Sequence, residues 1–523
     1  MKASLRSSRF ITATLLLSAL IVFSPVFRAP TNSRASFPSE GNQLSIILMI
    51  GDGMGFEHKR FSRWVEVGKE ANLTMEQLQL SYAVATYSAD NPITDSAASA
   101  TAMATGVKTN NGMVAMNPSG QPLETILEIA QTQGKSTGVV TTSFIQHATP
   151  ASFITHVTSR NNYSEITRQI VEEAEIDVLL GGGKKYFSTE QLNAMQMNGY
   201  TIVENKTALA SVTSGKALGL FSEEHIEYER YRDYATTPSL TTMTNKSIEI
   251  LSQDSDGFFL MVEGGRIDHA GHDNDKVSVA LETIAFDEAV KVALDYVQEN
   301  NNTILMVTAD HETGGLEIFS DNLNDILPSD SITEAQNREL RIDRATNITV
   351  SWSSTYHTAT DVPLYCYGSA FNGLQDDYLV DNIELFHIMN SYFSGTPITI
   401  PEYLPPPPST TLTTTEITTP PPSTTLTTTE TTTPPPNTTL TTTETTTSPP
   451  NTWTPITTTL TTTSTTTETT TLTPGTTTSI ATSTGTTDKN NPWQPISITI
   501  TVGLAGVVLL VFVVVLVRAK RQL

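Results

Sequence analysis

Four continuous apolar runs most constrain the fold of this 523-residue chain. They cover residues 44–50, 136–142, 258–262 and 303–307, and each is rich in Val, Ile, Leu or Phe. Such runs are typical of strands that are buried on both faces, as in a parallel sheet covered by helices. Helical stretches alternate with them, so residues 42–400 are predicted to form one α/β domain with a central, largely parallel sheet and helices on both faces.

Each apolar run is followed within a few residues by side chains that can do chemistry. In chain order these are Asp52, the pair His147 and Thr149, then Glu263 with Asp268 and His272, and finally Asp310 with His311. Sites in open α/β sheets form beyond the carboxyl ends of the strands. Carboxylates and imidazoles without thiolates suit Zn²⁺ and Mg²⁺. The single cysteine, Cys366, excludes a Cys-based zinc cluster, so the pattern favours a polynuclear site of His and carboxylates.

The spacing of two pairs supports this interpretation. Asp268 and His272 are one helical turn apart, so both can face one ion. Asp310 and His311 directly follow a predicted strand, where a turning backbone lets neighbours converge. Any one of these signals alone is weak, since an Asp-His pair is more often a surface feature, but four strands ending in ligand-type residues favour a shared site.

A candidate nucleophile lies in the segment 94–102. Small residues after Ser96 predict a tightly packed helix start, whose free N–H groups could bind an anion. A serine beside a divalent cation can lose its proton and attack phosphorus. The planar guanidinium of Arg160 can donate hydrogen bonds to two phosphate oxygens at once. Taken in isolation, these residues are also compatible with an Ala/Ser-rich packing helix and a surface charge.

Seven short blocks, in family order, resemble the alkaline phosphatases. The blocks lie at residues 51–55, 95–102, 148–150, 156–160, 263–272, 308–311 and 357–358. The resemblance covers roughly residues 44–394, and seven blocks in one order are far more specific than any single motif. It implies a phosphomonoesterase that acts on small phosphate monoesters, releases inorganic phosphate as product and inhibitor, and is usually a homodimer.

The resemblance also implies a role for each site residue. Ser96 would be the nucleophile that forms a phosphoserine, and Arg160 would clamp the phosphate, with two zinc ions and one magnesium ion as cofactors. The implied ligands are Asp268, His272 and His357 for the first zinc, Asp52, Asp310 and His311 for the second, and Asp52, Thr149 and Glu263 for magnesium.

Two positions depart from the familiar bacterial pattern. This chain has His147 and His269 where bacterial members commonly carry Asp and Lys, and histidine at both positions is similar to the animal members. Both histidines are candidates for a supporting role around the ligands. The alternative is that both are merely tolerated, and the identity of the third metal stays open.

The two ends of the chain predict export and anchoring. Residues 1–30 have a basic opening followed by an apolar run, which is typical of a signal peptide, with an uncleaved anchor as the alternative. Residues 496–517 carry no charge and are long enough for a transmembrane helix, and the basic residues of 518–523 predict a cytoplasmic tail. The catalytic domain is therefore expected at the cell surface, outside the cell.

Residues 401–490 are mostly Thr, Pro and Ser, with a repeated unit that contains almost no aliphatic residue. Such a segment has nothing to bury and is predicted to be a disordered stalk. Its dense Ser, Thr and Pro residues predict O-glycosylation, with a bare linker as the alternative. The formal net charge is −24. Without a basic stripe to displace counterions, the composition argues against nucleic acid as a partner.

Two other classes of function compete with this interpretation. Sulfatases, phosphodiesterases and phosphoglycerate mutases share the metal scaffold, but the block around Ser96 together with Arg160 differs from their motifs. A stalked surface protein on an inactive hydrolase fold is the second alternative. An inactive copy would be expected to lose ligands, whereas this chain keeps every ligand that the resemblance implies.

Overall fold

The structure is a computed structural model that describes residues 43–403, 497–504 and 507–514. The segments expected to be a signal peptide (1–30) and a cytoplasmic tail (518–523), and nearly all of the expected stalk (401–490), lie outside these residues. Contacts between residues divide the chain into two units, Met1–Thr414 and Thr415–Leu523.

The first unit contains a ten-stranded sheet within the described residues. Its strands are β1 (Ser45–Ile50), β2 (Leu80–Ala85), β3 (Ser136–Phe144), β4 (Val178–Gly182), β5 (Thr201–Val203), β6 (Ala217–Leu220), β7 (Phe258–Glu263), β8 (Thr303–Thr308), β13 (Val362–Tyr367) and β14 (Leu379–Asp381). Their order is β14-β2-β13-β8-β1-β7-β3-β4-β6-β5. Strand β13 runs antiparallel to its neighbours β2 and β8, and the other pairs are parallel.

The four apolar runs of the sequence form the centre of this sheet. They become β8, β1, β7 and β3, which are consecutive and mutually parallel. Every residue of β1, β7 and β8 is buried, as the continuous apolar pattern predicted. Because the strands are parallel, their carboxyl ends meet at one edge of the sheet, and the loops that follow them are brought together there.

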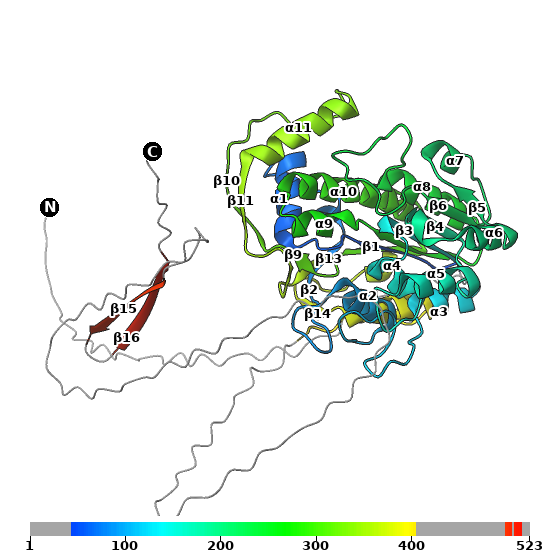
Figure 1. Cartoon of the computed structure of the whole chain (residues 1–523), viewed down its shortest axis with the longest axis horizontal. Helices are drawn as coiled ribbons and strands as arrows, with labels where there is room; N and C mark the ends of the chain where they lie inside the picture. The colour runs from blue at the N-terminus through cyan, green and yellow to red at the C-terminus, as the bar shows by residue number, and fades with distance from the viewer. Residues whose placement is uncertain (1–42, 404–496, 505–506, 515–523) are drawn as a thin grey trace, which may run out of the picture. The chain divides into compact units, whose positions relative to one another are not determined.

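Helices cover both faces of the sheet (Figure 1), with α8 and α10 on one side and α2 and α3 on the other. The helices are α1 (Phe56–Glu66), α2 (Ser96–Thr105), α3 (Ile126–Thr132), α4 (Ala148–Ile154), α5 (Tyr163–Glu172), α6 (Thr189–Met197), α7 (Lys206–Ala210), α8 (Leu240–Leu251), α9 (Arg266–His272), α10 (Lys276–Glu299), α11 (Glu334–Asn347) and α12 (Ile383–Phe393). Helix α10 packs against α1, α8, α9 and α11, whereas α2 packs against α4 and α12.

Two small antiparallel sheets also belong to the first unit. Strand β9 (Glu312–Thr313) pairs with β12 (His357–Thr358), and β10 (Leu316–Asp321) pairs with β11 (Ile348–Trp352). The β9–β12 pair joins the segment that follows β8 to a segment more than forty positions later in the chain. It therefore brings His357 to the end of β8.

The second unit corrects one prediction. The segment expected to be a transmembrane helix, 496–517, instead contains two antiparallel strands, β15 (Ser497–Leu504) and β16 (Val507–Val514). The segment is rich in Ile, Val and Thr, whose branched β-carbons favour strands over helices, and apolar length alone does not distinguish the two. Among the described residues, none of the helices combines the length and the apolar character needed to cross a bilayer.

Candidate active site

The loop after β1 brings Asp52 against the end of β8. Gly53 adopts φ +76°, and a Cβ at this position would lie 2.8 Å from Cα of Asp268, so the turn requires glycine. The Gly53 N–H donates to Oδ1 of Asp310 at 3.1 Å. This hydrogen bond ties the ends of two neighbouring strands together and places Asp52 and Asp310 in one buried cluster.

His311 completes this first cluster. Its Nε2 lies 3.5 Å from Oδ1 of Asp52 and 3.4 Å from Oδ2 of Asp310, and all three side chains are fully buried. Their ligand atoms lie within 4.8 Å of one another. The structure thus brings together Asp52, Asp310 and His311, the set that the sequence resemblance implied for the second zinc.

A second cluster lies at α9. Oδ1 of Asp268 is 3.4 Å from Nε2 of His272 and 3.5 Å from Nε2 of His357, and the two imidazole nitrogens are 3.2 Å apart. Nδ1 of His272 faces the carbonyl of Thr355 at 2.6 Å, and Nδ1 of His357 faces that of Thr94 at 3.0 Å. Because a carbonyl only accepts, each Nδ1 donates to it, and this hydrogen bond turns each Nε2 toward the cluster.

The third cluster centres on Glu263, the last residue of β7. Its Oε2 accepts from Oγ of Ser143 at 3.0 Å and also from Thr141. Ligand atoms of Asp52, His147 and Glu263 lie within 4.8 Å of one another. Thr149, the second residue of α4, is buried and lies beside Glu263. His147, expected only in a supporting role, therefore lies among the possible ligands themselves.

Ser96 is the first residue of α2, at the edge of these clusters. Its Oγ lies 3.1 Å from Nε2 of His311. Asp95 caps the helix, accepting from the Ala98 N–H at 3.0 Å. All residues of α2 are buried, because the small side chains let it pack closely on α4 and α12.

Arg160 lies on the same side of the site. Its Nη1 donates to Oδ2 of Asp95 at 2.9 Å, and its Nη2 lies 3.3 Å from Nε2 of His147. Ser96, Arg160 and the second cluster open onto one pocket of about 580 Å³. The other residues that line this pocket are Asn91, Ile93, Thr94, Asp95, Asn111, His147, His269 and Tyr356.

Three buried carboxylates of the site have raised pKa values. Burial raises the pKa of Asp52 well above its ordinary range, and the charge of Asp310 raises it further. Burial also raises the pKa of Glu263 to about 7 and that of Asp310 to about 6. Four buried oxygens of these carboxylates accept no hydrogen bond from a described residue: both oxygens of Asp52, Oε1 of Glu263 and Oδ2 of Asp310. Such orphaned oxygens fit divalent cations.

Three buried imidazoles of the site are held in the neutral form that metal ligands require. Burial lowers the pKa of His311 and of His147 well below the ordinary histidine value. Burial also lowers the pKa of His269 to about 4. Neutral imidazoles at these positions can offer a lone pair to a metal ion. For Asp268, burial acts to raise the pKa, but the hydrogen bond with His357 and the neighbouring histidines outweigh it and hold the pKa well below its ordinary range.

Some residues of the site carried no recognisable pattern in the sequence. Thr313 donates to Oδ1 of Asp268 at 2.5 Å and lies 3.3 Å from Nδ1 of His311, so it contacts two clusters at once. The ring of His225 lies edge-on to that of His269, with centroids 4.3 Å apart. Burial lowers the pKa of His225 to about 3. Thr313 follows a predicted ligand by two residues, which is a hint, whereas His225 lies in a loop far from any motif.

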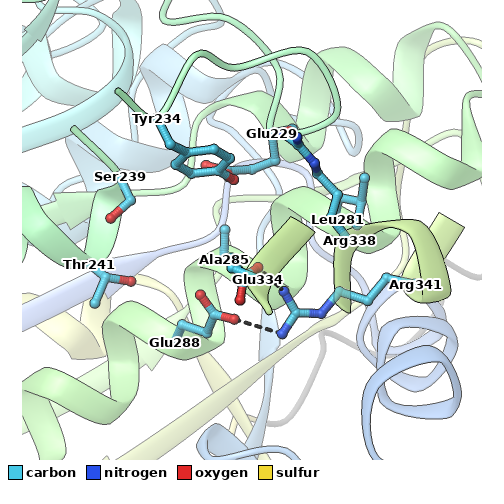
Figure 2. A pocket seen from close by; sticks show the side chains of 10 residues that line it. All are labelled: Glu229, Tyr234, Ser239, Thr241, Leu281, Ala285, Glu288, Glu334, Arg338 and Arg341. Atoms are coloured by element: carbon cyan, nitrogen blue, oxygen red, sulfur yellow. Dashed lines mark hydrogen bonds and ion pairs between the residues drawn. The ribbon is translucent and has the colours of Figure 1, made fainter. Parts of the chain in front are cut away.

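A second pocket, shown in Figure 2, contains none of the predicted site residues. It has a volume of about 220 Å³ and lies between α10, α11 and the loop before α8. Its charged groups neutralise one another: Arg341 pairs with Glu288 at 2.8 Å and with Glu334 at 3.0 Å. Ser239 is engaged as the N-cap of α8. The chemistry-bearing groups of the described residues therefore converge on the first pocket.

Comparisons with known proteins agree with this geometry. Residues 44–340 match the family model of alkaline phosphatase. The chain is 33% identical over 446 residues to alkaline phosphatase 4 of Bacillus subtilis, covering 73% of this chain and 96% of the relative. The solved structure of a cold-active alkaline phosphatase from the psychrophile Shewanella sp. is similar with a TM-score of 0.59 and 31% identity, covering 67% of this chain and 99% of that one.

A third similar protein is a mutant of the alkaline phosphatase of the Antarctic bacterium TAB5, solved with Mg bound in its M3 site. It has a TM-score of 0.56 and 30% identity, covering 67% of this chain and 99% of that one. The family match spans more than half of the chain and includes strands β1 to β8, the first and third clusters and the serine at the start of α2, whereas His357, β13 and β14 follow the matched residues. This chain therefore belongs to the alkaline phosphatase family of phosphomonoester hydrolases.

Proposed function

We propose that this chain hydrolyses phosphate monoesters through a phosphoserine on Ser96, with two zinc ions and one magnesium ion as cofactors. The observation that carries the proposal is the position of Ser96. Its hydroxyl is buried at the start of α2, 3.1 Å from Nε2 of His311 and beside the three His and carboxylate clusters. Few arrangements other than metal-assisted attack by serine account for a hydroxyl in this place.

Each of the three donor sets supports a place for one metal ion. Asp268, His272 and His357 would hold the first zinc, and Asp52, Asp310 and His311 the second. Asp52, Thr149 and Glu263 would hold magnesium, with His147 as a further possible ligand. When bound, such ions supply the positive charge that favours the Ser96 alkoxide and offsets the charge on the leaving oxygen.

The groups of the chain itself then perform two displacements. Oγ of Ser96 gives its proton to solvent and attacks phosphorus, the bond between phosphorus and the ester oxygen breaks, and the alcohol leaves after its oxygen takes a proton from water. Water then attacks the phosphorus of the phosphoserine and loses a proton, the bond between Oγ and phosphorus breaks, Oγ regains a proton, and inorganic phosphate is released. Arg160 directs two N–H donors at two phosphate oxygens throughout, and its ion pair with Asp95 keeps the guanidinium in place.

The test uses the full chain. Hydrolysis of a chromogenic phosphate monoester is measured before chelation, after chelation, and after adding back zinc and magnesium separately and together. We expect chelation to abolish hydrolysis and both metals to be required for full recovery. A phosphoenzyme formed with labelled substrate and quenched in acid should carry its label on Ser96. Hydrolysis that resists complete metal removal, or a label on another residue, would contradict the mechanism.

We also propose that the catalytic domain acts outside the cell. The basic and apolar opening of the sequence and the Thr/Pro-rich tract support this location. The full chain is expressed in its host, and hydrolysis of a substrate that cannot cross the membrane is compared between intact and lysed cells. Equal activity in both would support the proposal, and activity that appears only after lysis would overturn it.

A further inference from the structure

We propose that Ile93 and Tyr356 form a subsite that binds the alcohol part of the substrate and favours esters with an apolar or planar group near the phosphate. This inference rests on the proposed function, because it concerns the leaving group of the same reaction. It specifies which phosphate monoesters the site selects.

Both residues line the pocket that contains Ser96 and Arg160, and both expose large apolar surfaces. Ile93 is 40% exposed and Tyr356 is 75% exposed. The pocket volume of about 580 Å³ is in the range, roughly 300–1,000 Å³, that accommodates a whole small molecule. The phosphate group is held at the buried end by Ser96 and Arg160, so the remaining space is available to the alcohol.

One hydrogen bond joins the two loops that carry these residues. The Thr94 carbonyl accepts from Nδ1 of His357 at 3.0 Å. Ile93 directly precedes Thr94, and Tyr356 directly precedes His357. Two loops far apart in the sequence are thereby joined at the edge of the second cluster. The Tyr356 ring also lies edge-on to His272, with ring centroids 6.4 Å apart.

The backbone on both sides of this subsite is held in place. The Ile93 N–H donates to Oδ1 of Asn91 at 2.9 Å, and the Ile93 carbonyl accepts from Nδ2 of Asn111 at 2.9 Å. The Tyr356 N–H donates to Oγ of Ser354 at 2.8 Å, and its carbonyl accepts from the Gly314 N–H at 2.9 Å. A preformed surface loses little conformational entropy when a ligand binds.

Several polar atoms beside this surface already have partners. Oδ1 of Asn91 accepts from Ile93, while Asn111 accepts from the Asp95 N–H through Oδ1 and donates through Nδ2. The alkyl group of Ile93 and the ring of Tyr356 are the exposed apolar surfaces that this side offers to an incoming alcohol. An aromatic ring prefers planar and apolar contacts, which favours alcohols with an aryl or alkyl group over small polar ones.

The experiment compares kcat/KM of the full chain for phenethyl phosphate and ethyl phosphate. Both esters release a primary alcohol, so their ratio reports contacts with the alcohol rather than the intrinsic reactivity of the ester. We expect the wild-type chain to prefer phenethyl phosphate. Tyr356→Ala should reduce this preference by about threefold to tenfold, Ile93→Ala by less, and Tyr356→Phe should retain it. Tyr231 is another exposed tyrosine, and it does not line the pocket. Tyr231→Ala is therefore the matched control and should leave the ratio of kcat/KM for the two esters unchanged.

The outcomes separate the subsite from the proposed function. An unchanged preference in Tyr356→Ala and Ile93→Ala overturns the subsite, while continued hydrolysis of ethyl phosphate leaves the proposed function standing. An equal loss for both esters in Tyr356→Ala means that the side chain positions His357, and also overturns the subsite. If the wild-type chain hydrolyses neither ester, the proposed function fails. Calorimetric binding of phenethylphosphonate and ethylphosphonate to the wild type and Tyr356→Ala then decides the subsite without turnover.

Discussion

Arg160 donates from Nη1 to Oδ2 of Asp95 at 2.9 Å, and the other oxygen of the same carboxylate caps the helix that begins at Ser96. Oδ1 of Asp95 accepts from the N–H groups of Ala98 and Gly112, each at 3.0 Å. A single carboxylate therefore positions both the proposed nucleophile and the guanidinium that would grip phosphate.

This relationship predicts that Asp95→Ala and Asp95→Asn differ. Both variants free Arg160 from its charged partner, so phosphate inhibition should weaken by about tenfold in each. Asp95→Ala also removes the helix cap and should lower the free energy of unfolding by about 1 kcal/mol, whereas Asp95→Asn keeps a capping oxygen. Inhibition constants for phosphate and urea unfolding curves check both effects. Unchanged phosphate inhibition in both variants would contradict the positioning role of Asp95.

Ser96→Ala should lower kcat by at least about a thousandfold, because Ser96 supplies the pocket hydroxyl that lies within hydrogen-bond distance of Nε2 of His311, whereas that of Thr94 donates to the Asp95 carbonyl. Bound zinc should remain, since the implied ligands are unchanged. The matched control is Ser164→Ala, an exposed serine at the start of α5, which should keep full activity. Steady-state kinetics and metal analysis of the purified variants test this, and substantial activity in Ser96→Ala would refute the assignment.

His147→Asp should tighten magnesium binding by about tenfold, because it adds a negative charge beside Asp52 and Glu263. Combined with His269→Lys, which places a cation near the phosphate position, it should also strengthen phosphate inhibition and lower kcat. Magnesium titration by calorimetry and phosphate inhibition at one alkaline pH measure these effects. His387→Asp, on the exposed surface of α12, is the control for added charge. Identical constants in all variants would make the two histidines bystanders.

The pair of His156 and Glu128 predicts a pH-dependent contribution to stability. Burial acts to lower the pKa of His156, but its 3.0 Å contact with Glu128 outweighs this and raises the pKa above 6.5. For Glu128, burial acts to raise the pKa, but the same contact and the Thr125 N–H lower it below 4.5. The pair therefore stabilises the fold fully between pH 4.5 and pH 6.5, the ordinary pKa values of the two groups. This stabilisation is lost as pH rises through the raised pKa of His156 or falls through the lowered pKa of Glu128.

His156→Gln should consequently lower Tm by about 1–2 °C more at about pH 6 than at about pH 9. Thermal unfolding of both proteins at the two pH values provides the measurement. An equal difference in Tm at both pH values would show that the charge of His156 does not contribute.

The segment 43–403 should fold and hydrolyse phosphate monoesters when it is expressed alone. Its sheet and both helix layers lie within these residues, and the Thr/Pro-rich tract that follows has almost no apolar side chain to add to the core. Circular dichroism, gel filtration and activity per active site, compared with the full chain, test this expectation. An insoluble or inactive segment would show that later residues support the domain.

The sequence by itself determined the centre of the fold and most of the site. Short apolar runs rich in Val, Ile, Leu and Phe are typical of strands buried on both faces, so β1, β3, β7 and β8 could be predicted as buried strands of a largely parallel sheet. Their order as neighbours came from the structure. The polar residues after them had to meet at one edge, because parallel strands share an edge at their carboxyl ends. The spacing of Asp268 and His272 likewise placed both on one face of α9.

Tertiary structure decided what local patterns do not encode. His147 lies among the possible ligands, and His225 and Thr313 lie against the clusters, because α4, the loop after β6 and the β9–β12 pair converge from distant parts of the chain. The segment 496–517 was predicted as a helix from its apolar length, yet its β-branched residues pair as β15 and β16. The periodicity of apolar residues indicates which face of a helix or strand is buried. It does not indicate which residues of distant elements contact that face, because those contacts form only when the core packs.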